Sequence, residues 1–404
     1  MLHIEMGELM FRLLLLAFIL IPMVAVGSSL SQVSTENIST KNARLHKACQ
    51  QLPFATSAWV INLNDGKLAA VDNEGIQISS DDGKTWSEPR QIKMPDGTVP
   101  QRWEHGTIML QTKSGVLIML YMEQGSSFYE WNNELGKPDP RCKLDVWACR
   151  SMDGGKTWTD FNRILDGYNG QIIDIKQLST GRVATLIQDM YMDLGRHYLF
   201  GCVSDDEGKT WKRGSNIDIG GHGDHDGALE PTLVELTDGQ VMTLIRTNLD
   251  EFWSAYSDTH GLYWRVIKPS GIDASSAPGY LLRLASGRIA LIWIRVGLEK
   301  TPNIQRIPVC QMTETPFSWN RAELSIMFSS DDGKTWSKPV VAAAALEGEM
   351  AYAYMLERKS GEIWIIVRCP HGDPVSFKLY EKDFVRNGKY KRYKTTHGSD
   401  HYTK

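Results

Sequence analysis

Residues 79–86 read Ser-Ser-Asp-Asp-Gly-Lys-Thr-Trp, and the pattern within them, Ser-x-Asp-x-Gly-x-Thr-Trp, decides the fold because the chain repeats it. Intact copies also occupy residues 151–158, 204–211 and 329–336. A worn fifth copy at residues 257–264 keeps the Ser, Gly and Trp but has lost the Asp and the Thr. A short structural unit that recurs along a chain indicates a repeat architecture.

Each copy has the chemistry of a tight turn between two strands. Ser and Asp side chains hydrogen-bond nearby backbone N–H groups and so hold a turn. Glycine adopts a positive φ without steric cost, and the Thr and Trp that follow suit the start of a strand with an inward-packing ring. The four Asp residues therefore have a structural role, and we exclude them from the candidate site: Asp81, Asp153, Asp206 and Asp331.

A second repeat counts the units. Six short hairpin turns lie between apolar runs: Asp65-Gly66, Ser114-Gly115, Thr180-Gly181, Asp238-Gly239, Ser286-Gly287 and Ser360-Gly361. Five are followed by a copy of the first pattern and the last is not. Hairpins at this spacing predict an all-β fold, a six-bladed β-propeller of four-stranded blades. We expect the last blade to contain residues 375–380 and to borrow a strand from near the N-terminus, which closes the ring and removes an open sheet edge.

The N-terminal residues have the pattern of an export signal. Residues 13–27 are nearly all apolar, follow Arg12 and end in Ala-Val-Gly, as signal peptides do. The run is shorter than the roughly twenty apolar residues of a membrane span. We therefore expect a signal peptide at 1–27, a segment at 28–50 that closes the ring, the propeller at 51–388 and a basic, solvated tail at 389–404. The mature protein should be secreted or periplasmic, without a membrane span.

Charge and cysteine content exclude several classes of function. A net charge of −4 over 404 residues gives no support to nucleic-acid binding. The six cysteines fit an exported protein, and the sequence leaves open whether they form disulfides or remain buried thiols. Because they show no Cys-x-x-Cys spacing, zinc is not expected. We expect no cofactor, no metal and a monomer. The cysteines are Cys49, Cys142, Cys149, Cys202, Cys310 and Cys369.

The repeated Ser-x-Asp-x-Gly-x-Thr-Trp pattern is the motif called the Asp-box. Together with the six hairpins it resembles the sialidase superfamily, in particular bacterial sialidase-like proteins with Asp-box repeats. The resemblance covers essentially the whole chain after the predicted signal peptide. It implies a secreted, exo-acting glycoside hydrolase that cleaves a terminal acidic sugar, such as sialic acid, from a glycan. Since one fold hosts many functions, two alternatives stay open: a non-catalytic propeller that binds carbohydrate or protein, and an inverting glycosidase that acts on a different sugar with two carboxylates.

The resemblance also implies a nucleophile and its base. Sialidases use a Tyr nucleophile paired with a Glu, an Asp acid/base and three arginines that bind a carboxylate. Glu230 and Tyr352 each lie nine residues before the glycine of a hairpin, at the start of a predicted inner strand. Their neighbourhoods are similar to the Glu and Tyr segments of sialidases. Glu230 would therefore act as base to Tyr352, whose phenol is otherwise a poor nucleophile.

Three arginines share a position after the hairpins. Arg246 and Arg368 each follow a hairpin glycine by seven residues, and Arg295 by eight. The resemblance assigns Arg246 to the substrate carboxylate, whereas Arg368 and Arg295 are supported by position alone. Each could instead be a strand-end arginine paired with a neighbouring acid. Residues 52–72 contain no arginine, although sialidases carry their first one in an Arg-Ile-Pro phrase there. We interpret the Arg-Ile-Pro at 306–308 as coincidence, because it lies in the wrong blade.

Two candidates compete for the acid/base. Asp72, beside Glu74, is the nearest match to the sialidase Asp before the first box. The rival is the glycine-rich loop 220–227, in which Asp224 could transfer protons; the alternative for this loop is an ordinary polar surface. Residues 103–105 open the inner strand of the second blade, and the insertion 128–131 could stack against a sugar. The remaining candidate substrate contacts are Glu104, His222, His225 and Asp226.

Overall fold

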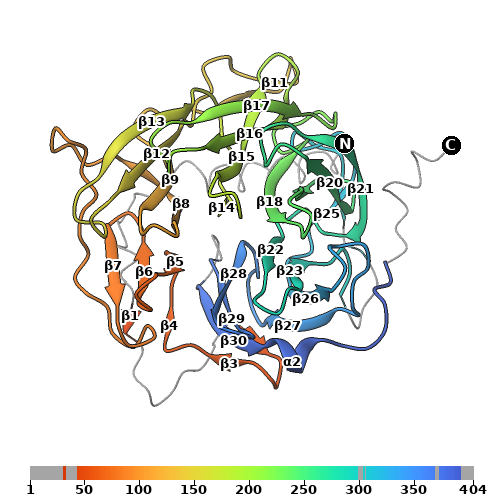
Figure 1. The fold of residues 1–404 in the computed structure, drawn as a ribbon. Helices are drawn as coiled ribbons and strands as arrows, with labels where there is room; N and C mark the ends of the chain where they lie inside the picture. Colours follow the sequence, from red (N-terminus) through yellow and green to blue (C-terminus); the bar gives the residue numbers. More distant parts are fainter. Residues whose placement is uncertain (1–30, 33–42, 299–303, 305, 369–372, 393–404) are drawn as a thin grey trace.

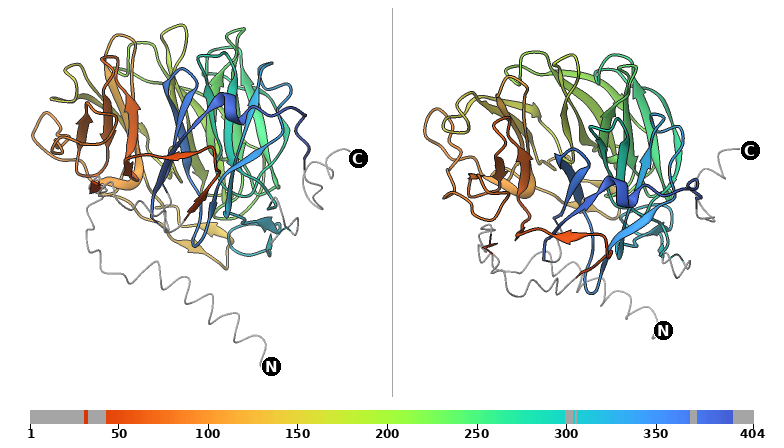
Figure 2. Two further views of the ribbon diagram at one scale, coloured as in Figure 1. Left: turned by 90° about the horizontal axis from the view of Figure 1, so that it is seen from below. Right: turned by 60° about the horizontal axis from the view of Figure 1, so that its bottom comes forward.

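The computed structural model describes residues 31–32, 43–298, 304, 306–368 and 373–392. Six antiparallel sheets are arranged around a central axis, which confirms the all-β, six-bladed β-propeller (Figure 1). From the side, the strands run from one face of the ring to the other (Figure 2). The predicted signal peptide lies outside the described residues. No helix in the described ranges is long and apolar enough to cross a membrane.

The first three blades follow each other along the chain. Blade 1 has β5 (Trp59–Asn62), β6 (Leu68–Val71) and β7 (Ile76–Ser79); blade 2 has β8 (Arg102–Gln111), β9 (Leu117–Glu123), β12 (Val146–Ser151) and β13 (Thr159–Leu165); blade 3 has β14 (Ile175–Gln177), β15 (Val183–Tyr191), β16 (Arg196–Ser204) and β17 (Lys212–Ile217). In place of a fourth strand, blade 1 has an isolated bridge between Ile76 and Arg90. The neighbouring Pro89 carries no N–H for a ladder.

The last three blades complete the ring. Blade 4 has β18 (Leu229–Glu235), β19 (Val241–Arg246), β20 (Glu251–Ser257) and β21 (Arg265–Asp273); blade 5 has β22 (Tyr280–Arg283), β23 (Ile289–Ile294), β26 (Glu323–Ser329) and β27 (Val340–Ala345); blade 6 has β28 (Ala353–Lys359), β29 (Glu362–Val367) and β30 (Val375–Tyr380). Three short pairs and one helix lie outside the blades: β1 (Ser31–Gln32) with β4 (Phe54–Ala55), β10 (Trp131–Asn132) with β11 (Lys137–Pro138), β24 (Arg306–Ile307) with β25 (Phe317–Ser318), and α2 (Glu381–Phe384).

Two N-terminal strands close the ring. β3 (Gln50–Gln51) pairs with β30 as the fourth strand of blade 6, and β2 (Ala43–Leu45) adds a fifth strand to blade 5 beside β27.

The start of the basic tail also packs on the ring rather than standing in solvent, which corrects our expectation for it. Tyr390 bonds through its hydroxyl to the backbone N–H of Asp273 at 2.7 Å, and Arg392 lies 3.2 Å from the buried carboxylate of Glu251.

The two sequence repeats take different places in each blade. The six hairpins join the first strand to the second, whereas the boxed turns join the third to the outermost position. In the first box Asp81 accepts hydrogen bonds from the backbone N–H and the hydroxyl of Thr85 at 2.9 and 2.7 Å. In the worn box Thr259 replaces this Asp and accepts from the Tyr263 N–H at 2.8 Å. The turn therefore survives the loss of its carboxylate.

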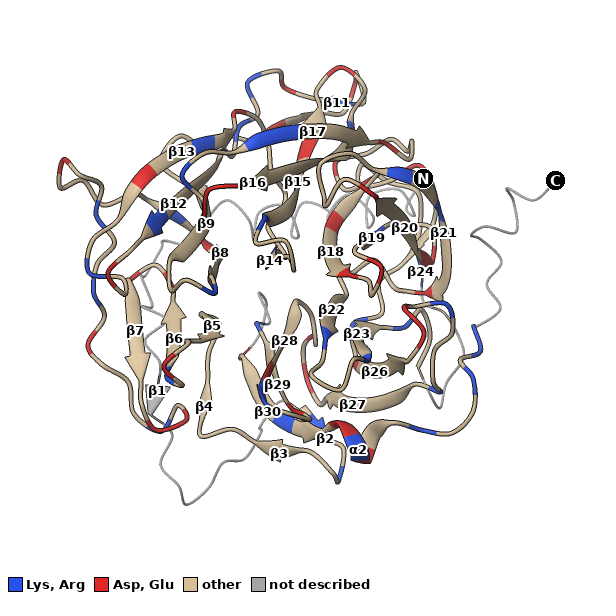
Figure 3. Ribbon diagram, viewed as in Figure 1, with Lys and Arg blue, Asp and Glu red and all other residues tan. Residues whose placement is uncertain are grey.

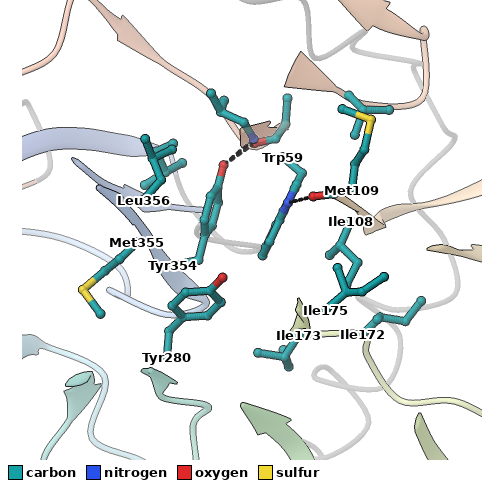
Figure 4. Packing of buried hydrophobic residues seen from close by; sticks show 14 of the residues in the cluster. Trp59, Ile108, Met109, Ile172, Ile173, Ile175, Tyr280, Tyr354, Met355 and Leu356 are labelled. Atoms are coloured by element: carbon teal, nitrogen blue, oxygen red, sulfur yellow. Dashed lines mark hydrogen bonds between the residues drawn. The ribbon is translucent and has the colours of Figure 1, made fainter. Parts of the chain in front are cut away.

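Buried side chains from several blades meet at the axis (Figure 4). Trp59 stacks on Tyr354 with ring centroids 4.0 Å apart, and its indole N–H donates to the carbonyl of Met109 at 2.8 Å. Tyr280 lies edge-on to both rings. The six blades repeat the same antiparallel strand order, so their inner strands β5, β8, β14, β18, β22 and β28 run in the same direction along the axis. We call the face at which they begin the strand-start face.

Candidate active site

Three side chains from two blades form a hydrogen-bonded group on the strand-start face. Glu230 is the second residue of β18, Arg246 ends β19, and Tyr352 immediately precedes β28. The Tyr352 hydroxyl donates to Glu230 Oε1 at 2.8 Å, and Arg246 Nη1 donates to Glu230 Oε2 at 2.6 Å. The Glu230–Arg246 ion pair is buried, with side chains 7% and 3% exposed. The structure thus brings these three sequence-predicted residues together.

The backbone is bent where Glu230 and Tyr352 leave it. Their φ angles are +37° and +58°, values that non-glycine residues rarely adopt and that are found often at functional sites. At Glu230 a one-residue bulge interrupts the pairing of β18 with β19, and its N–H donates to the side-chain oxygen of Gln188 at 3.0 Å. The bulge and this support turn the carboxylate toward Tyr352.

Charges around Tyr352 act in both directions on its proton. Burial and the neighbouring Glu230 carboxylate raise the pKa of Tyr352 to about 12, although Arg246 and Arg321 oppose the rise. Burial by itself lowers the pKa of Arg246, but the negative charge of Glu230 opposes this effect and the pKa is raised overall. The phenol is therefore protonated at neutral pH, and it can act as a nucleophile only if Glu230 takes its proton.

Arg321, which the sequence did not indicate, lies beside this group. Its guanidinium carbon is 5.9 Å from the centre of the Tyr352 ring and 3.8 Å from that of Trp319. Its terminal nitrogens donate to Glu349 and to the Ser276 carbonyl, both at 3.1 Å. Arg321 precedes the third strand of blade 5. It therefore lacks the spacing after a hairpin glycine by which the other arginines were predicted.

Asp72 immediately follows β6 and closes a turn with its own side chain. Oδ1 accepts hydrogen bonds from the Glu74 and Gly75 N–H groups at 2.9 and 3.2 Å. Oδ2 is buried and has no hydrogen-bond partner among the described residues. Burial raises the pKa of Asp72, as a carboxylic acid that must hold its proton requires. Arg102, another residue that the sequence did not indicate, donates to the Asp72 carbonyl at 2.7 Å.

A small cavity on the strand-start face joins Asp72 to Arg368. Arg368 follows β29 of blade 6 and donates from Nε to the carbonyl of Ser57 in blade 1 at 2.9 Å. Burial lowers the pKa of Arg368 to about 10, so it carries its charge at neutral pH. Its backbone N–H points to the Tyr352 carbonyl at 3.4 Å. The lining residues are Ser57, Val71, Asp72, Asn73, Glu104, His105, Thr107 and Arg368.

Arg295 is not part of this group, and our assignment of it to the substrate is corrected. Its guanidinium bonds to both carboxylate oxygens of Asp273, at 3.2 and 2.7 Å, on β21 at the outer edge of blade 4. Its guanidinium carbon is also 5.5 Å from the centre of the Tyr390 ring. Arg295 is therefore a strand-end arginine that anchors the C-terminal segment.

The carboxylates of loop 220–227 hold the loop itself. Asp226 accepts from the Gly227 and His222 N–H groups and from the Thr313 hydroxyl. Asp224 is 7% exposed. Its Oδ2 accepts a hydrogen bond from Gln311 Nε2, and its Oδ1 lies 2.8 Å from His225 Nδ1. Although burial opposes it, these two contacts lower the pKa of Asp224. Both carboxylates are thus engaged in loop structure, which argues against their use as acid/base or as sugar contacts.

The loop nevertheless borders the site. The carbonyl of His225 accepts from Asn248 Nδ2 at 2.7 Å, and Asn248 Oδ1 accepts from the Ser276 hydroxyl, which in turn accepts from Arg246. His222 lies farther out, with its ring 6.1 Å from that of Trp131 in the insertion. The Glu104 side chain is 66% exposed at the rim of the cavity.

The described residues hold no group of three or more His, Cys, Asp or Glu side chains that could bind a metal ion. Five of the cysteines lie in the described ranges and all five are free thiols, whereas Cys369 lies outside those ranges: Cys49, Cys142, Cys149, Cys202 and Cys310. Acidic and basic residues are interspersed around the ring (Figure 3).

Comparisons with known proteins agree with this fold. The chain is 24% identical over 316 residues to a sialidase of Micromonospora viridifaciens; the match covers 74% of this chain but only 46% of that protein. Among solved structures, a Hadza microbial sialidase superposes with a TM-score of 0.53 at 15% identity, covering 81% of this chain and 66% of the other. An α-L-arabinanase of Penicillium chrysogenum, complexed with arabinobiose, gives 0.51 at 15%, covering 83% and 94%.

The likeness to these solved structures shows the fold alone, because the identities are low. A match to a family description goes further: the BNR repeat-like domain matches residues 75–365, which is most of the chain and takes in all five copies of the box. The chain therefore belongs to the BNR repeat-like domain family.

Proposed function

We propose that the protein is an exo-acting glycoside hydrolase that removes a terminal acidic sugar, such as sialic acid, from a glycan. The observation that carries this proposal is the 2.8 Å hydrogen bond from the Tyr352 hydroxyl to Glu230, with Arg246 on the other carboxylate oxygen. A propeller that only binds its partner has no need of a partly buried Tyr–Glu pair on a strained backbone. Secretion or export to the periplasm, and a monomeric state, remain predictions.

The residues support a two-step, retaining reaction. In the first step the Tyr352 oxygen bonds to the anomeric carbon and its proton passes to Glu230. The glycosidic C–O bond breaks, its electron pair stays on the leaving oxygen, and that oxygen takes the proton of Asp72. In the second step water gives a proton to Asp72 and its oxygen bonds to the same carbon. The Tyr352–carbon bond breaks, and Tyr352 regains its proton from Glu230.

Three buried arginines support an acidic substrate. Arg246 and Arg321 lie against the Tyr–Glu pair, and Arg368 lies on the side of Asp72. Residues 52–72 contain no arginine of their own, but Arg368 reaches from blade 6 to the carbonyl of Ser57 within that segment. We infer that Arg368 supplies the positive charge that the first blade lacks. A neutral Tyr also suits an acidic sugar, since an anionic nucleophile would be repelled by the substrate carboxylate.

A panel of 4-methylumbelliferyl glycosides tests the proposal. Wild-type protein is assayed against α-sialyl, glucuronyl and α-L-arabinofuranosyl derivatives, and the configuration of the released sugar is followed by NMR. We expect hydrolysis of an acidic glycoside with retention of configuration. Inversion, or hydrolysis of the neutral furanoside alone, would contradict the proposal. Glycan binding measured by calorimetry without turnover would identify a carbohydrate-binding propeller instead.

A further inference from the structure

We propose that His105 is a further substrate-contacting residue of this site, and that its imidazole binds the oxygen atom to which Asp72 transfers its proton. This inference rests on the proposed glycosidase function and adds a residue to it. His105 belongs to β8 in blade 2, which contributes none of the residues assigned above to the nucleophile, its base or the acid.

The first observation is the backbone conformation at His105. In the described ranges ten non-glycine residues have a positive φ. Seven lie in turns or in outer strands away from the inner-strand starts: Asp82, Asp160, Glu207, Asp250, His260, Val266 and Asp332. The other three, His105 at +61°, Glu230 at +37° and Tyr352 at +58°, lie where the inner strands of alternate blades begin. Strained residues of this kind persist where function requires an aimed side chain.

A wide bulge directs the side chain of His105. Arg102 pairs with Glu123 and Thr107 with Tyr121, so the four residues 103–106 on β8 face a single residue on β9. A bulge releases residues from the ladder and re-aims their side chains. The side chain of His105 is 18% exposed, whereas that of Glu104 is 66% exposed, and Glu104 Oε1 lies 3.5 Å from His105 Nε2.

The cavity that His105 lines contains polar atoms that the fold does not satisfy. Asp72 Oδ2 and the Thr107 hydroxyl are both buried and lack a hydrogen-bond partner among the described residues. Both residues line this cavity together with His105 and Arg368. Buried polar atoms are almost always paired. Unpaired atoms around one small space therefore indicate a place for an oxygen-bearing group.

The chemistry of the reaction identifies that group. Asp72 gives its proton to the leaving oxygen when the glycosidic bond breaks, and the water of the second step must occupy the same position. An imidazole N–H at the edge of the cavity can donate a hydrogen bond to this oxygen in both steps. His105 keeps its own proton throughout: the transferred proton belongs to Asp72, and the electron pair of the broken bond remains on the leaving oxygen.

His105→Asn tests the inference, because Asn tolerates a positive φ nearly as well as His and removes only the imidazole. The control is His260→Asn, which changes the same residue type at a similar φ of +52° in the worn box, far from the strand starts. Both variants are assayed with phenyl and 4-nitrophenyl derivatives of the acidic sugar that wild type hydrolyses, and their melting temperatures are measured.

We expect His105→Asn to lower kcat at least tenfold for the phenyl glycoside, whose leaving group needs a proton, and much less for the 4-nitrophenyl glycoside. KM and the melting temperature should change little, and His260→Asn should match wild type. Unchanged kinetics, or equal losses on both substrates with a lower melting temperature, would overturn the inference. Inactive wild type on the whole panel would instead overturn the proposed function and this inference with it.

Discussion

At the scale of single residues, the site is built by exceptions to the rules that build the blades. Glu230 and Tyr352 have backbone angles that strands avoid, and Asp72 keeps a buried oxygen without a partner in the described ranges. Arg368 leaves its own blade to bond the carbonyl of Ser57. The strained angles and the unpaired buried oxygen cost stability.

The Tyr–Glu pair gives the first prediction. Tyr352→Phe should lower kcat at least 10³-fold while leaving substrate affinity nearly unchanged, because only the bond formed in the transition state is lost. Hydrolysis is followed by fluorescence and binding by calorimetry. Tyr256→Phe, which removes a phenol from β20 in the same ring, serves as control. A Tyr352→Phe enzyme with full activity would rule out Tyr352 as the nucleophile.

The raised pKa of Asp72 sets the alkaline side of the pH profile. Asp72 must be protonated to act, so kcat/KM for a phenyl glycoside should fall as the pH rises through this pKa, which burial places above the usual Asp range. Asp72→Asn should remove this fall and lower kcat by about 10²–10⁴-fold. If the pH profile of the variant keeps the same alkaline fall, another group is the acid.

Arg368 and Arg295 allow a matched comparison. Arg368→Lys should raise KM for the acidic glycoside about tenfold, since lysine cannot replace the planar two-pronged grip on a carboxylate. Arg295→Lys, which weakens the bidentate contact to Asp273, should lower the melting temperature and leave KM unchanged. Steady-state kinetics and thermal melts distinguish the two, and the reverse result would assign Arg295 to the substrate.

The part of the site that could be predicted followed the repeat. Glu230, Tyr352, Arg246 and Arg368 share positions relative to the hairpin glycines, so the sequence placed them on one face. Arg295 shares nearly the same position, but its guanidinium bonds to Asp273 on the outer strand of blade 4. The sequence could not predict this contact, because only the fold places the two residues together. Arg321 does not follow a hairpin glycine at the spacing of the other arginines. Only the fold shows that it lies beside the rings of Trp319 and Tyr352.

At the scale of the elements, the boxed turn is a modular stabiliser. Its carboxylate and hydroxyl bonds lie within eight residues, which explains why each boxed turn could be predicted from the sequence alone, whereas the number of blades came from the six hairpins. The worn copy shows that a hydroxyl can replace the carboxylate. The pattern did not predict that blade 1 has only three strands. Pro89, which lacks an N–H for a fourth strand, follows the box and is not part of the repeated pattern.

The box tryptophans differ in burial, and this gives a prediction for the elements. Trp158 is 3% exposed, whereas Trp211 is only partly buried. Trp158→Ala should lower the free energy of unfolding by about 3–5 kcal/mol, as expected for a large ring removed from a packed interior, and Trp211→Ala by clearly less. Urea denaturation followed by circular dichroism measures both. Equal losses would mean that the indole does not stabilise the turn through burial.

At the scale of the whole molecule, the ring depends on pairing between distant parts of the chain. β3 bonds to β30 in blade 6, and β2 to β27 in blade 5, so each of these blades joins a strand from before residue 52 to strands from after residue 279. The sequence predicted such a closure because the sixth hairpin has no box after it. It could not predict that two blades, rather than one, would receive N-terminal strands.

Removing these strands tests their contribution. A chain that begins at residue 52 lacks β2 and β3, and it should melt at a lower temperature than a chain that begins at residue 43, because two sheet edges are left unpaired. Differential scanning calorimetry of both chains gives the comparison. Identical melting curves would show that the outer strands of these blades do not stabilise the ring.

The same closure also orders events in time during synthesis. Gln51 pairs with Phe377, so one partner has been made long before the other exists. At the ribosomal rate of 5–20 residues per second the wait is on the order of 15 to 65 s. Throughout that interval the nascent chain carries unpaired sheet edges and an incomplete barrier to water at the axis. The ring therefore closes only after blade 6 has been made, and until then the growing chain is the form most exposed to aggregation and proteolysis.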